Sequence, residues 1–314
     1  MGTVTFAVCT YNRKQRLLPL IEALKNLQSP IHFEILFVDN NSNDGTAEVL
    51  SEHSGGSPSL RFVTERTPGI VPARNRAIEE TLKRGSDYLV FIDDDEIPFP
   101  GMLSAAVHAL VEEKAEAVGG RVKVRFPIER PKWLEDNLLG FLSEVNYGEE
   151  PFWITNGSTP VWTSNIAYRM DLFADGLRFD SRYNRQGYAV GGGEDVMMFE
   201  ELLKRGIKMR YRPDMAVHHD VEEWRISRRY FIKLHYTSGW KSGMWEDSTY
   251  SREILGVPPF LVTQAFRHFM HAVPLLVGGR QGAMRQAMTA AHSFGMIGGR
   301  YSRWMDLRKR EETL

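Results

Sequence analysis

Three consecutive carboxylates, Asp93, Asp94 and Asp95, directly follow an apolar stretch with the pattern of a buried strand. Their charges repel one another, and a divalent cation is the usual means of offsetting such repulsion. Mg²⁺ and Mn²⁺ prefer oxygen ligands and often take only one or two carboxylates together with phosphate oxygens. Because alternate strand residues face the same side, Asp93 and Asp95 could present one carboxylate to a metal and another to a ribose or a metal-bound water. The alternative interpretation is a solvated acidic loop.

Two further polar clusters could meet a nucleotide. Asp39 ends a second apolar strand and could accept hydrogen bonds from a base or ribose, although Asn41 or Ser42 could simply cap the next helix. Arg74 lies near the start of a later helix, where an arginine makes a ready anion site. A solvated helix face is the alternative, and it suits Arg76 better than Arg74.

A run of glycines, Gly191–Gly193, leads into Glu194 and Asp195 at the start of another helix. Glycine lets a substrate approach the backbone. A carboxylate held beside such a cleft could act as a general base. The plainer interpretation of Asp195 is that it caps the helix.

Two histidines, His218 and His219, end a later strand. Alternation places them on opposite faces, so at most one of them joins a given site. A single histidine at a strand end is more often structural than a ligand. Beside three carboxylates that need a cation, a ligand role is favoured, and His219 is preferred because it shares a face with Val217.

The elements that must position these clusters alternate between strand and helix patterns over the first hundred residues. Short apolar, β-branched stretches predict strands at 3–10, 33–39, 60–64 and 88–92. Apolar residues at helical spacing predict helices at 13–27, 45–53 and 72–84. Further on, a helix is expected at 195–205 and a strand at 208–219. This alternation predicts an α/β fold with an open, mostly parallel sheet and helices on both faces, in which ligands bind beyond the carboxyl ends of the strands.

The composition suits one large domain, or one domain with an appendage, because 314 residues with 42% hydrophobic content can bury a sizeable core. A net charge of −1 gives no reason to expect nucleic acid as a partner. The single cysteine, Cys9, excludes an intrachain disulfide and is expected to be a small buried hydrophobe. Neither a secretory pattern nor an apolar run of bilayer length is evident, so a cytoplasmic protein is predicted.

Taken in order along the chain, these stretches resemble glycosyltransferase family 2, and within it bacterial exopolysaccharide enzymes of the succinoglycan glucosyltransferase type. The matching stretches are Val8–Arg13, Val38–Asp44, Ala73–Arg76, Phe91–Pro98, Gly193–Asp195 and Val217–His219. Each stretch is a weak signal alone, but the ordered set is specific. The resemblance implies a GT-A fold, with a Rossmann-like, mostly parallel central sheet flanked by helices and a C-terminal helical extension.

The resemblance also implies roles for the matching residues. Donor binding would fall to Thr10, Tyr11, Arg13, Asp39, Asn41, Arg74, Asp93 and Asp94. The ligands of a Mg²⁺ or Mn²⁺ ion would come from Asp95, Asp93, His219 and His218. The catalytic pair would be Asp195, as base, and Glu194. Weaker signals for acceptor binding are Trp162, Asn165, Gly192 and Gly193. The third aspartate and the paired histidines leave open which carboxylates and which histidine bind the metal.

The implied enzyme is an inverting hexosyltransferase of polysaccharide biosynthesis. It would move a sugar from a nucleotide-diphosphate donor, a UDP-sugar by resemblance, to a glycan or lipid-linked acceptor. A catalytic domain is predicted at 1–221, with a nucleotide-sugar half at 1–117 and an acceptor half at 118–221, followed by a basic helical extension at 222–314.

The end of this extension is amphipathic as well as basic. Residues 258–314 hold 8 Lys and Arg against 3 Asp and Glu, with large apolar residues interleaved. Such helices can lie on an anionic surface, which predicts a peripheral protein at the inner face of the cell membrane, beside a lipid-linked acceptor. Packing on the catalytic domain or formation of a homodimer explains the pattern equally well.

Three other functions compete with this interpretation. A metal-dependent nucleotidyl- or phosphotransferase would also use acidic clusters at strand ends, but the sequence lacks a Gly-rich loop ending in Gly-Lys-Ser/Thr. A non-catalytic module that binds sugar nucleotides or glycans would be favoured by loss of Asp195 or of the aspartates, and all are present. A polysaccharide-assembly scaffold acting through the basic tail is the third.

Overall fold

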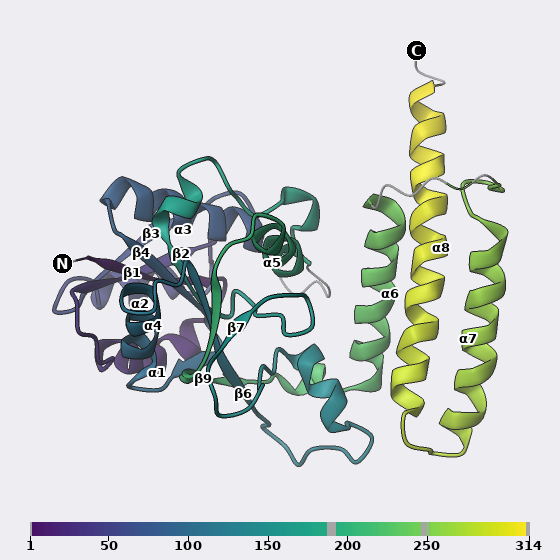
Figure 1. Cartoon of the computed structure of the whole chain (residues 1–314), viewed down its shortest axis with the longest axis horizontal. Helices are drawn as coiled ribbons and strands as arrows, with labels where there is room; N and C mark the ends of the chain where they lie inside the picture. The colour runs from purple at the N-terminus through teal and green to yellow at the C-terminus, as the bar shows by residue number, and fades with distance from the viewer. Residues whose placement is uncertain (1, 187–192, 246–249, 251, 312–314) are drawn as a thin grey trace. The chain divides into compact units, whose positions relative to one another are not determined.

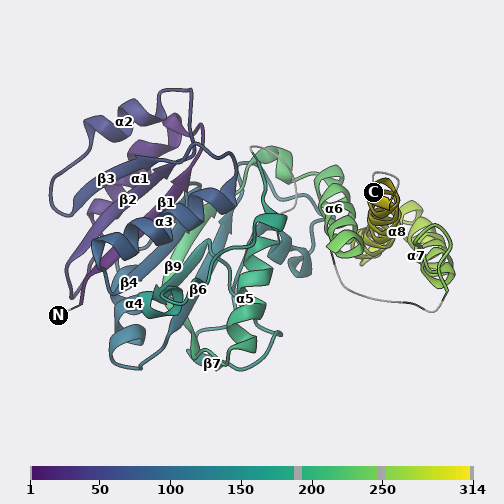
Figure 2. The ribbon, with the colours of Figure 1, turned by 90° about the horizontal axis from the view of Figure 1, so that it is seen from above.

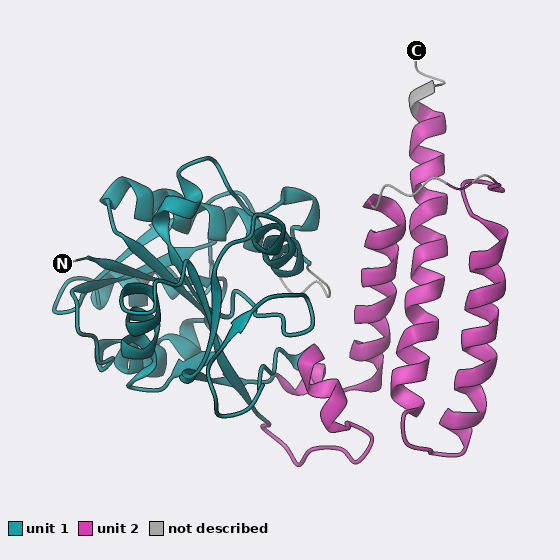
Figure 3. Cartoon of the chain, viewed as in Figure 1, with its two compact units in different colours: residues 1–125, 142–188, 193–221 teal, residues 126–141, 189–192, 222–314 magenta. Residues whose placement is uncertain are grey.

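The computed structural model describes residues 2–186, 193–245, 250 and 252–311 (Figure 1). They form two compact units, coloured separately in Figure 3. Unit 1 contains residues 1–125, 142–188 and 193–221, and unit 2 contains 126–141 and 222–314. One boundary between the two units falls after Val221. The stretch 126–141, predicted to belong to the catalytic domain, is instead part of the helical unit.

The described residues of unit 1 form a nine-stranded sheet with the order β3-β2-β1-β4-β8-β6-β9-β5, and β7 pairs with β9. The strands are β1 (Val4–Thr10), β2 (Phe33–Asp39), β3 (Ser59–Thr64), β4 (Tyr88–Asp93), β5 (Glu96–Pro98), β6 (Ala117–Arg125), β7 (Phe152–Ile154), β8 (Asn165–Arg169) and β9 (Met209–Asp220). From β3 to β4 the sheet is parallel. Beyond β4 it is mixed, because β8 runs antiparallel to both β4 and β6. The prediction of a mostly parallel sheet therefore holds for the N-terminal half only.

The helices of unit 1 cover both faces of this sheet (Figures 1 and 2). They are α1 (Lys14–Lys25), α2 (Thr46–Glu52), α3 (Ile70–Arg84), α4 (Met102–Val111) and α5 (Glu194–Lys204). Every residue of β1 and β2 is buried, as expected for parallel strands covered on both sides. Helix α1 buries Leu17, Leu20, Ile21 and Leu24, which recur at helical spacing. Each such side chain contributes about 1.5–3 kcal/mol by leaving water.

Strand β5 is the element of unit 1 that most affects the site, and no sequence pattern predicts it. It follows the aspartates after β4 and pairs antiparallel with the end of β9, with Glu96 opposite His219 and Ile97 opposite His218. This pairing brings the end of β9 next to the end of β4, although the two strands are far apart in sequence.

Unit 2 contains three long helices, α6 (Arg228–Trp245), α7 (Pro259–Val277) and α8 (Ala283–Glu311), with α8 between α6 and α7 (Figures 1 and 2). Short 3₁₀ helices lie elsewhere in the chain at Asp136–Leu142, Met170–Phe173, Ser181–Tyr183 and Glu223–Arg225. No described helix is long and apolar enough to cross a membrane.

Helices α6 and α8 touch through glycines spaced four residues apart on each helix. A Cβ atom would lie 2.0–2.3 Å from a carbonyl oxygen of the facing helix at each of Gly239, Gly243, Gly295 and Gly299. Real Cβ atoms do not come so close, so any other residue would push the two backbones apart. The small-xxx-small spacing therefore explains how these helices pack at such short range.

Candidate functional site

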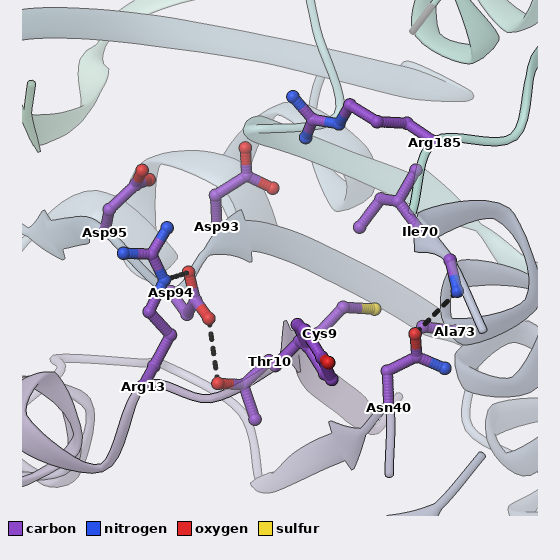
Figure 4. A pocket seen from close by; sticks show the side chains of 12 residues that line it. Cys9, Thr10, Arg13, Asn40, Ile70, Ala73, Asp93, Asp94, Asp95 and Arg185 are labelled. Atoms are coloured by element: carbon purple, nitrogen blue, oxygen red, sulfur yellow. Dashed lines mark hydrogen bonds and ion pairs between the residues drawn. The ribbon is translucent and has the colours of Figure 1, made fainter. Parts of the chain in front are cut away.

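A pocket opens at the carboxyl ends of β1 and β4, and Figure 4 shows it from close by. Ligands bind at this edge in open α/β sheets. All of its lining residues belong to unit 1: Cys9, Thr10, Tyr11, Arg13, Asn40, Gly69, Ile70, Ala73, Asp93, Asp94, Asp95 and Arg185. The pocket thus brings together the three aspartates and the predicted donor-binding residues of the first loop.

The three aspartates have different partners, and the middle one, Asp94, contacts the first loop. Its Oδ2 accepts a hydrogen bond from the Thr10 hydroxyl at 2.8 Å, and its Oδ1 lies 3.6 Å from Nε of Arg13. Burial, reinforced by the charge of Asp95, raises the pKa of Asp94 to about 7 against the opposing effect of Arg13. A cation bound beside Asp94 would favour its ionised form.

Asp95 lies next to the histidine at the end of β9. Nδ1 of His219 is 3.2 Å from Oδ1 of Asp95 and 3.8 Å from Oε1 of Glu96, and His219 is buried. Burial raises the pKa of Glu96 well above its ordinary value. The neighbouring His218 packs against the ring of Phe99, with ring centroids 4.6 Å apart. Of the two predicted histidines, the structure places His219 beside an aspartate.

The described residues contain no group of three or more His, Cys, Asp or Glu side chains arranged to hold a metal ion. Asp95 and His219 offer one oxygen and one nitrogen, 3.2 Å apart. This pair fits Mg²⁺ or Mn²⁺, which commonly keep few protein ligands and complete their coordination with water and phosphate oxygens. It does not fit a closed, all-protein metal cage. Asp93, another predicted ligand, contacts an arginine instead.

That arginine, Arg74, lies at the centre of a buried ion cluster. Its Nη1 is 2.9 Å from Oε1 of Glu194 and 2.5 Å from Oδ1 of Asp195, and its Nη2 is 3.2 Å from Oδ1 of Asp93. Although burial opposes it, the surrounding carboxylates raise the pKa of Arg74, with Asp195 the largest contributor. The guanidinium therefore stays charged and connects the end of β4 to the start of α5. The predicted role of Arg74 in donor binding stays a prediction, because its direct contacts are to carboxylates.

Helix α5 begins at Glu194, and its N-cap is Gly193. The interpretation of Asp195 as the helix cap is therefore wrong. Gly193 has φ of 111°, which favours glycine, and a Cβ atom there would lie 2.9 Å from the ring of Tyr183. The Asp195 side chain is 26% exposed, whereas Glu194 is buried and burial raises its pKa. Of the two carboxylates, Asp195 is the one that an incoming hydroxyl could reach.

Asp39, the last residue of β2, and Asn41, in the loop that follows, were predicted to bind the donor but are not among the residues that line the pocket. Asp39 is buried, and its Oδ1 accepts hydrogen bonds from the backbone N–H of Ser42 at 3.1 Å and from the Ser42 hydroxyl. Asn41 is exposed and has φ of 61°. Asn40, which was not predicted, lines the pocket, and its Oδ1 accepts a hydrogen bond from the Gly69 N–H at 2.7 Å. The loop is thus held by side chains that bond the backbone.

Two of the predicted acceptor-binding residues, Asn165 and Trp162, are buried or partly buried. Asn165 is buried, and its Nδ2 donates to the carbonyl oxygens of Arg121 and Met215 at 3.0 and 2.8 Å. This placement corrects the prediction, because a buried amide that joins neighbouring strands cannot contact an acceptor. Trp162 is partly buried against the core. Gly192 lies outside the described residues.

Arg185 and Cys9, like Asn40, line the pocket without having been predicted as site residues. The Arg185 guanidinium points toward Asp93 (Figure 4) and has no hydrogen-bond or ion-pair partner among the described residues. An arginine in a polar loop carries no pattern, and its position depends on the bond from the Ile70 N–H to its carbonyl oxygen. Cys9 was predicted only as a buried hydrophobe. Burial raises the pKa of its thiol to about 12, so it stays neutral.

The sequence model described as "Glycosyl transferase family 2" matches residues 5–177. Among related proteins, the succinoglycan biosynthesis protein ExoM of Rhizobium meliloti (strain 1021) is 26% identical over 250 residues, which are 76% of this chain and 74% of that protein. The glycosyltransferase AglE of Haloferax volcanii is 29% identical over 126 residues, 40% of each chain.

Solved structures of similar fold extend over nearly the whole chain. The mannosyltransferase PcManGT from Pyrobaculum calidifontis, in complex with GDP-Man and Mn²⁺, has a TM-score of 0.55 at 18% identity and covers 99% of this chain and 88% of its own. TarS 1–349 of S. aureus, in complex with UDP-GlcNAc, has a TM-score of 0.57 at 15% identity and covers 96% and 92%. At these identities the likeness concerns the fold alone, and it confirms the predicted fold class.

Proposed function

Because the chain belongs to glycosyltransferase family 2, we propose that it is an inverting enzyme that transfers a sugar from a UDP-sugar to a glycan or lipid-linked acceptor in polysaccharide biosynthesis. The family and the GT-A fold make it a transferase. One observation carries the finer proposal. Arg74 holds Asp195, a partly exposed carboxylate, in the same ion cluster as Asp93 at the edge of the pocket.

In this proposal Asp95 and His219 hold a Mg²⁺ or Mn²⁺ ion. Their spacing of 3.2 Å and the Mn²⁺ in the PcManGT complex support it. When bound, the ion supplies the positive charge that neutralises the departing nucleoside diphosphate. Arg13 and Arg185, which line the same pocket, can add cationic contacts to the phosphates.

Asp195 is the proposed general base. It takes the proton of the acceptor hydroxyl as that oxygen forms a bond to the anomeric carbon. The bond from this carbon to the diphosphate oxygen breaks at the same time, on the opposite face of the sugar, so the configuration inverts. The charged guanidinium of Arg74, whose Nη1 lies 2.5 Å from Oδ1 of Asp195, holds this carboxylate in place.

UDP is proposed on the resemblance to exopolysaccharide enzymes and on the TarS complex with UDP-GlcNAc. Because the PcManGT complex holds GDP-Man, the binding of UDP-sugars to this chain should be compared directly with the binding of GDP-sugars. We further propose that the helical extension keeps the enzyme at the membrane surface where a lipid-linked acceptor would lie.

Binding and slow hydrolysis of a panel of sugar nucleotides, with and without Mn²⁺, tests the donor site. We expect one UDP-sugar to bind and hydrolyse only with metal, and Asp95→Ala to abolish both, because the variant removes a metal ligand. A folded wild-type protein that binds no sugar nucleotide with Mn²⁺ present would sink the donor-site assignment.

The adjacent histidines provide a matched pair for the metal site. His219→Ala is expected to raise the apparent Kd for Mn²⁺ in the presence of nucleotide by about 10- to 100-fold, since even supporting groups of metal sites have effects of this size. His218→Ala should leave the Kd unchanged, because that ring packs against Phe99. Manganese titration by electron paramagnetic resonance measures both. An equal rise in the Kd for Mn²⁺ in the two variants would contradict the assignment of His219, rather than His218, as the metal ligand.

A further inference from the structure

One side of α7 exposes apolar side chains along its length. They are Val262, Phe266, Phe269, Met270, Val273, Leu276 and Val277, with exposed fractions of 38% to 85%. At 3.6 residues per turn they fall within about 120° of the helix circumference, over roughly 22 Å of its axis. Leu261, Ala265 and Ala272 are buried elsewhere on the helix, which packs on α8. A continuous band of this kind, here called the α7 band, is typical of an interaction surface rather than of scattered exposed residues.

A pocket within unit 2 adjoins the C-terminal end of the α7 band, since Leu276 belongs to both. Three cationic side chains line it, Lys132 and Arg228 from two earlier segments and Arg280 from the turn after α7. Glu135 is the one acidic residue among its described lining residues, and it accepts a hydrogen bond from a backbone N–H of the same turn at 2.7 Å. This cation pocket suits a phosphate group, whose oxygens accept bonds from arginine and lysine.

The charged residues around the α7 band in the sequence are all positive. Between Glu253 and Asp306 the sequence contains five arginines and no Asp or Glu. A Lys or Arg side chain close to an anionic bilayer is attracted to it electrostatically. With no carboxylate in this stretch, nothing in α7 or in most of α8 opposes that attraction.

We propose that the α7 band lies lengthwise in the headgroup layer of an anionic membrane, with a lipid phosphate bound in the cation pocket. The inference rests on the proposed role of the extension at a membrane, and it names the face and the lipid class. Burial of the band in the boundary between headgroups and acyl chains satisfies its apolar side chains. A second copy of the chain fits less well, because a two-fold contact would bring identical cationic rims together.

Flotation with vesicles tests the proposal. Wild-type protein should bind vesicles of phosphatidylcholine with phosphatidylglycerol more strongly than vesicles of phosphatidylcholine alone. The double variant Phe266→Glu with Val277→Glu should partition about tenfold or more weakly, because two apolar side chains no longer leave water. His271→Glu is the control for each single variant, since it adds one such charge at an exposed position outside the band. Lys132→Ala with Arg280→Ala should weaken the preference for phosphatidylglycerol, because two of the three cationic side chains that line the pocket are lost.

Undiminished flotation of the double variant would overturn the docking face, and an undiminished lipid preference in Lys132→Ala with Arg280→Ala would overturn the phosphate site. If the double variant floats normally but dissociates a wild-type dimer in light scattering, the band is a contact between copies. Donor hydrolysis in free solution separates this inference from the proposed function, because the same variants should hydrolyse donor at the wild-type rate. A wild-type protein that floats but hydrolyses no sugar nucleotide would sink the proposed function and leave the docking intact.

Discussion

Asp195→Asn is expected to lower kcat by about 10²- to 10⁴-fold, the contribution typical of a general base. Asparagine keeps the shape of the side chain and an oxygen that can accept the hydrogen bond of Arg74, which lies 2.5 Å from the carboxylate in the wild type. It cannot take a proton from the acceptor. Steady-state kinetics with the identified donor and acceptor would measure the loss, and donor titration should give a Kd within a few-fold of wild type.

Glu194→Gln is the matched control for this substitution. Glu194 is buried, and its Oε1 lies 2.9 Å from Nη1 of the same arginine. Neutralising the Glu194 carboxylate should lower kcat far less than Asp195→Asn does, because an acceptor hydroxyl cannot reach the buried Glu194 side chain. A larger loss in Glu194→Gln than in Asp195→Asn would move the base assignment to Glu194.

Arg74→Met is expected to reduce the free energy of unfolding by about 3–5 kcal/mol, the usual cost of removing one partner from a buried ion pair. The variant would leave three carboxylates near one another without the guanidinium that contacts all of them, and the arginine itself is only 2% exposed. Urea unfolding followed by circular dichroism would measure the change. The repulsion should be strongest without divalent metal, so added Mn²⁺ and donor should recover part of the loss by binding the folded state.

Arg76→Met on the same helix is the control for stability. Arg76 is partly exposed and pairs with Glu80 at 3.1 Å. Exposed pairs of this kind contribute about 0–1 kcal/mol. Equal destabilisation by the two variants would show that the cluster around Arg74 has no special part in the fold.

Much of the N-terminal half of unit 1 could be predicted because its pattern is local. The bounds of β2, Phe33–Asp39, match the prediction, since a short, mostly apolar stretch between polar segments has one reasonable interpretation. Strand β5 has only three residues, one of them proline, and so carries no pattern of its own. The membership of 126–141 in unit 2 depends on distant contacts, which a local pattern does not contain.

The sequence indicates which types of residue the site contains, but it does not indicate which of these residues contact one another. The sequence indicates that carboxylates, a histidine and an arginine converge, but the proximity of Asp95 to His219 depends on how β5 pairs with β9. The contacts of Arg74 depend in the same way on where α5 begins. Asn165 shows the reverse error, because its polar side chain suggests binding although its amide joins two buried carbonyl oxygens.

The glycine contacts between α6 and α8 bear on how unit 2 tolerates a change of solvent. Backbones that touch at Gly239, Gly243, Gly295 and Gly299 are held by close van der Waals contact, which does not require water to drive the helices together. A helix pair held only by the hydrophobic effect would loosen in an apolar medium, whereas this pair would stay assembled. At the edge of a bilayer the α6–α8 pair would therefore remain preformed, without the entropic cost of folding at the surface.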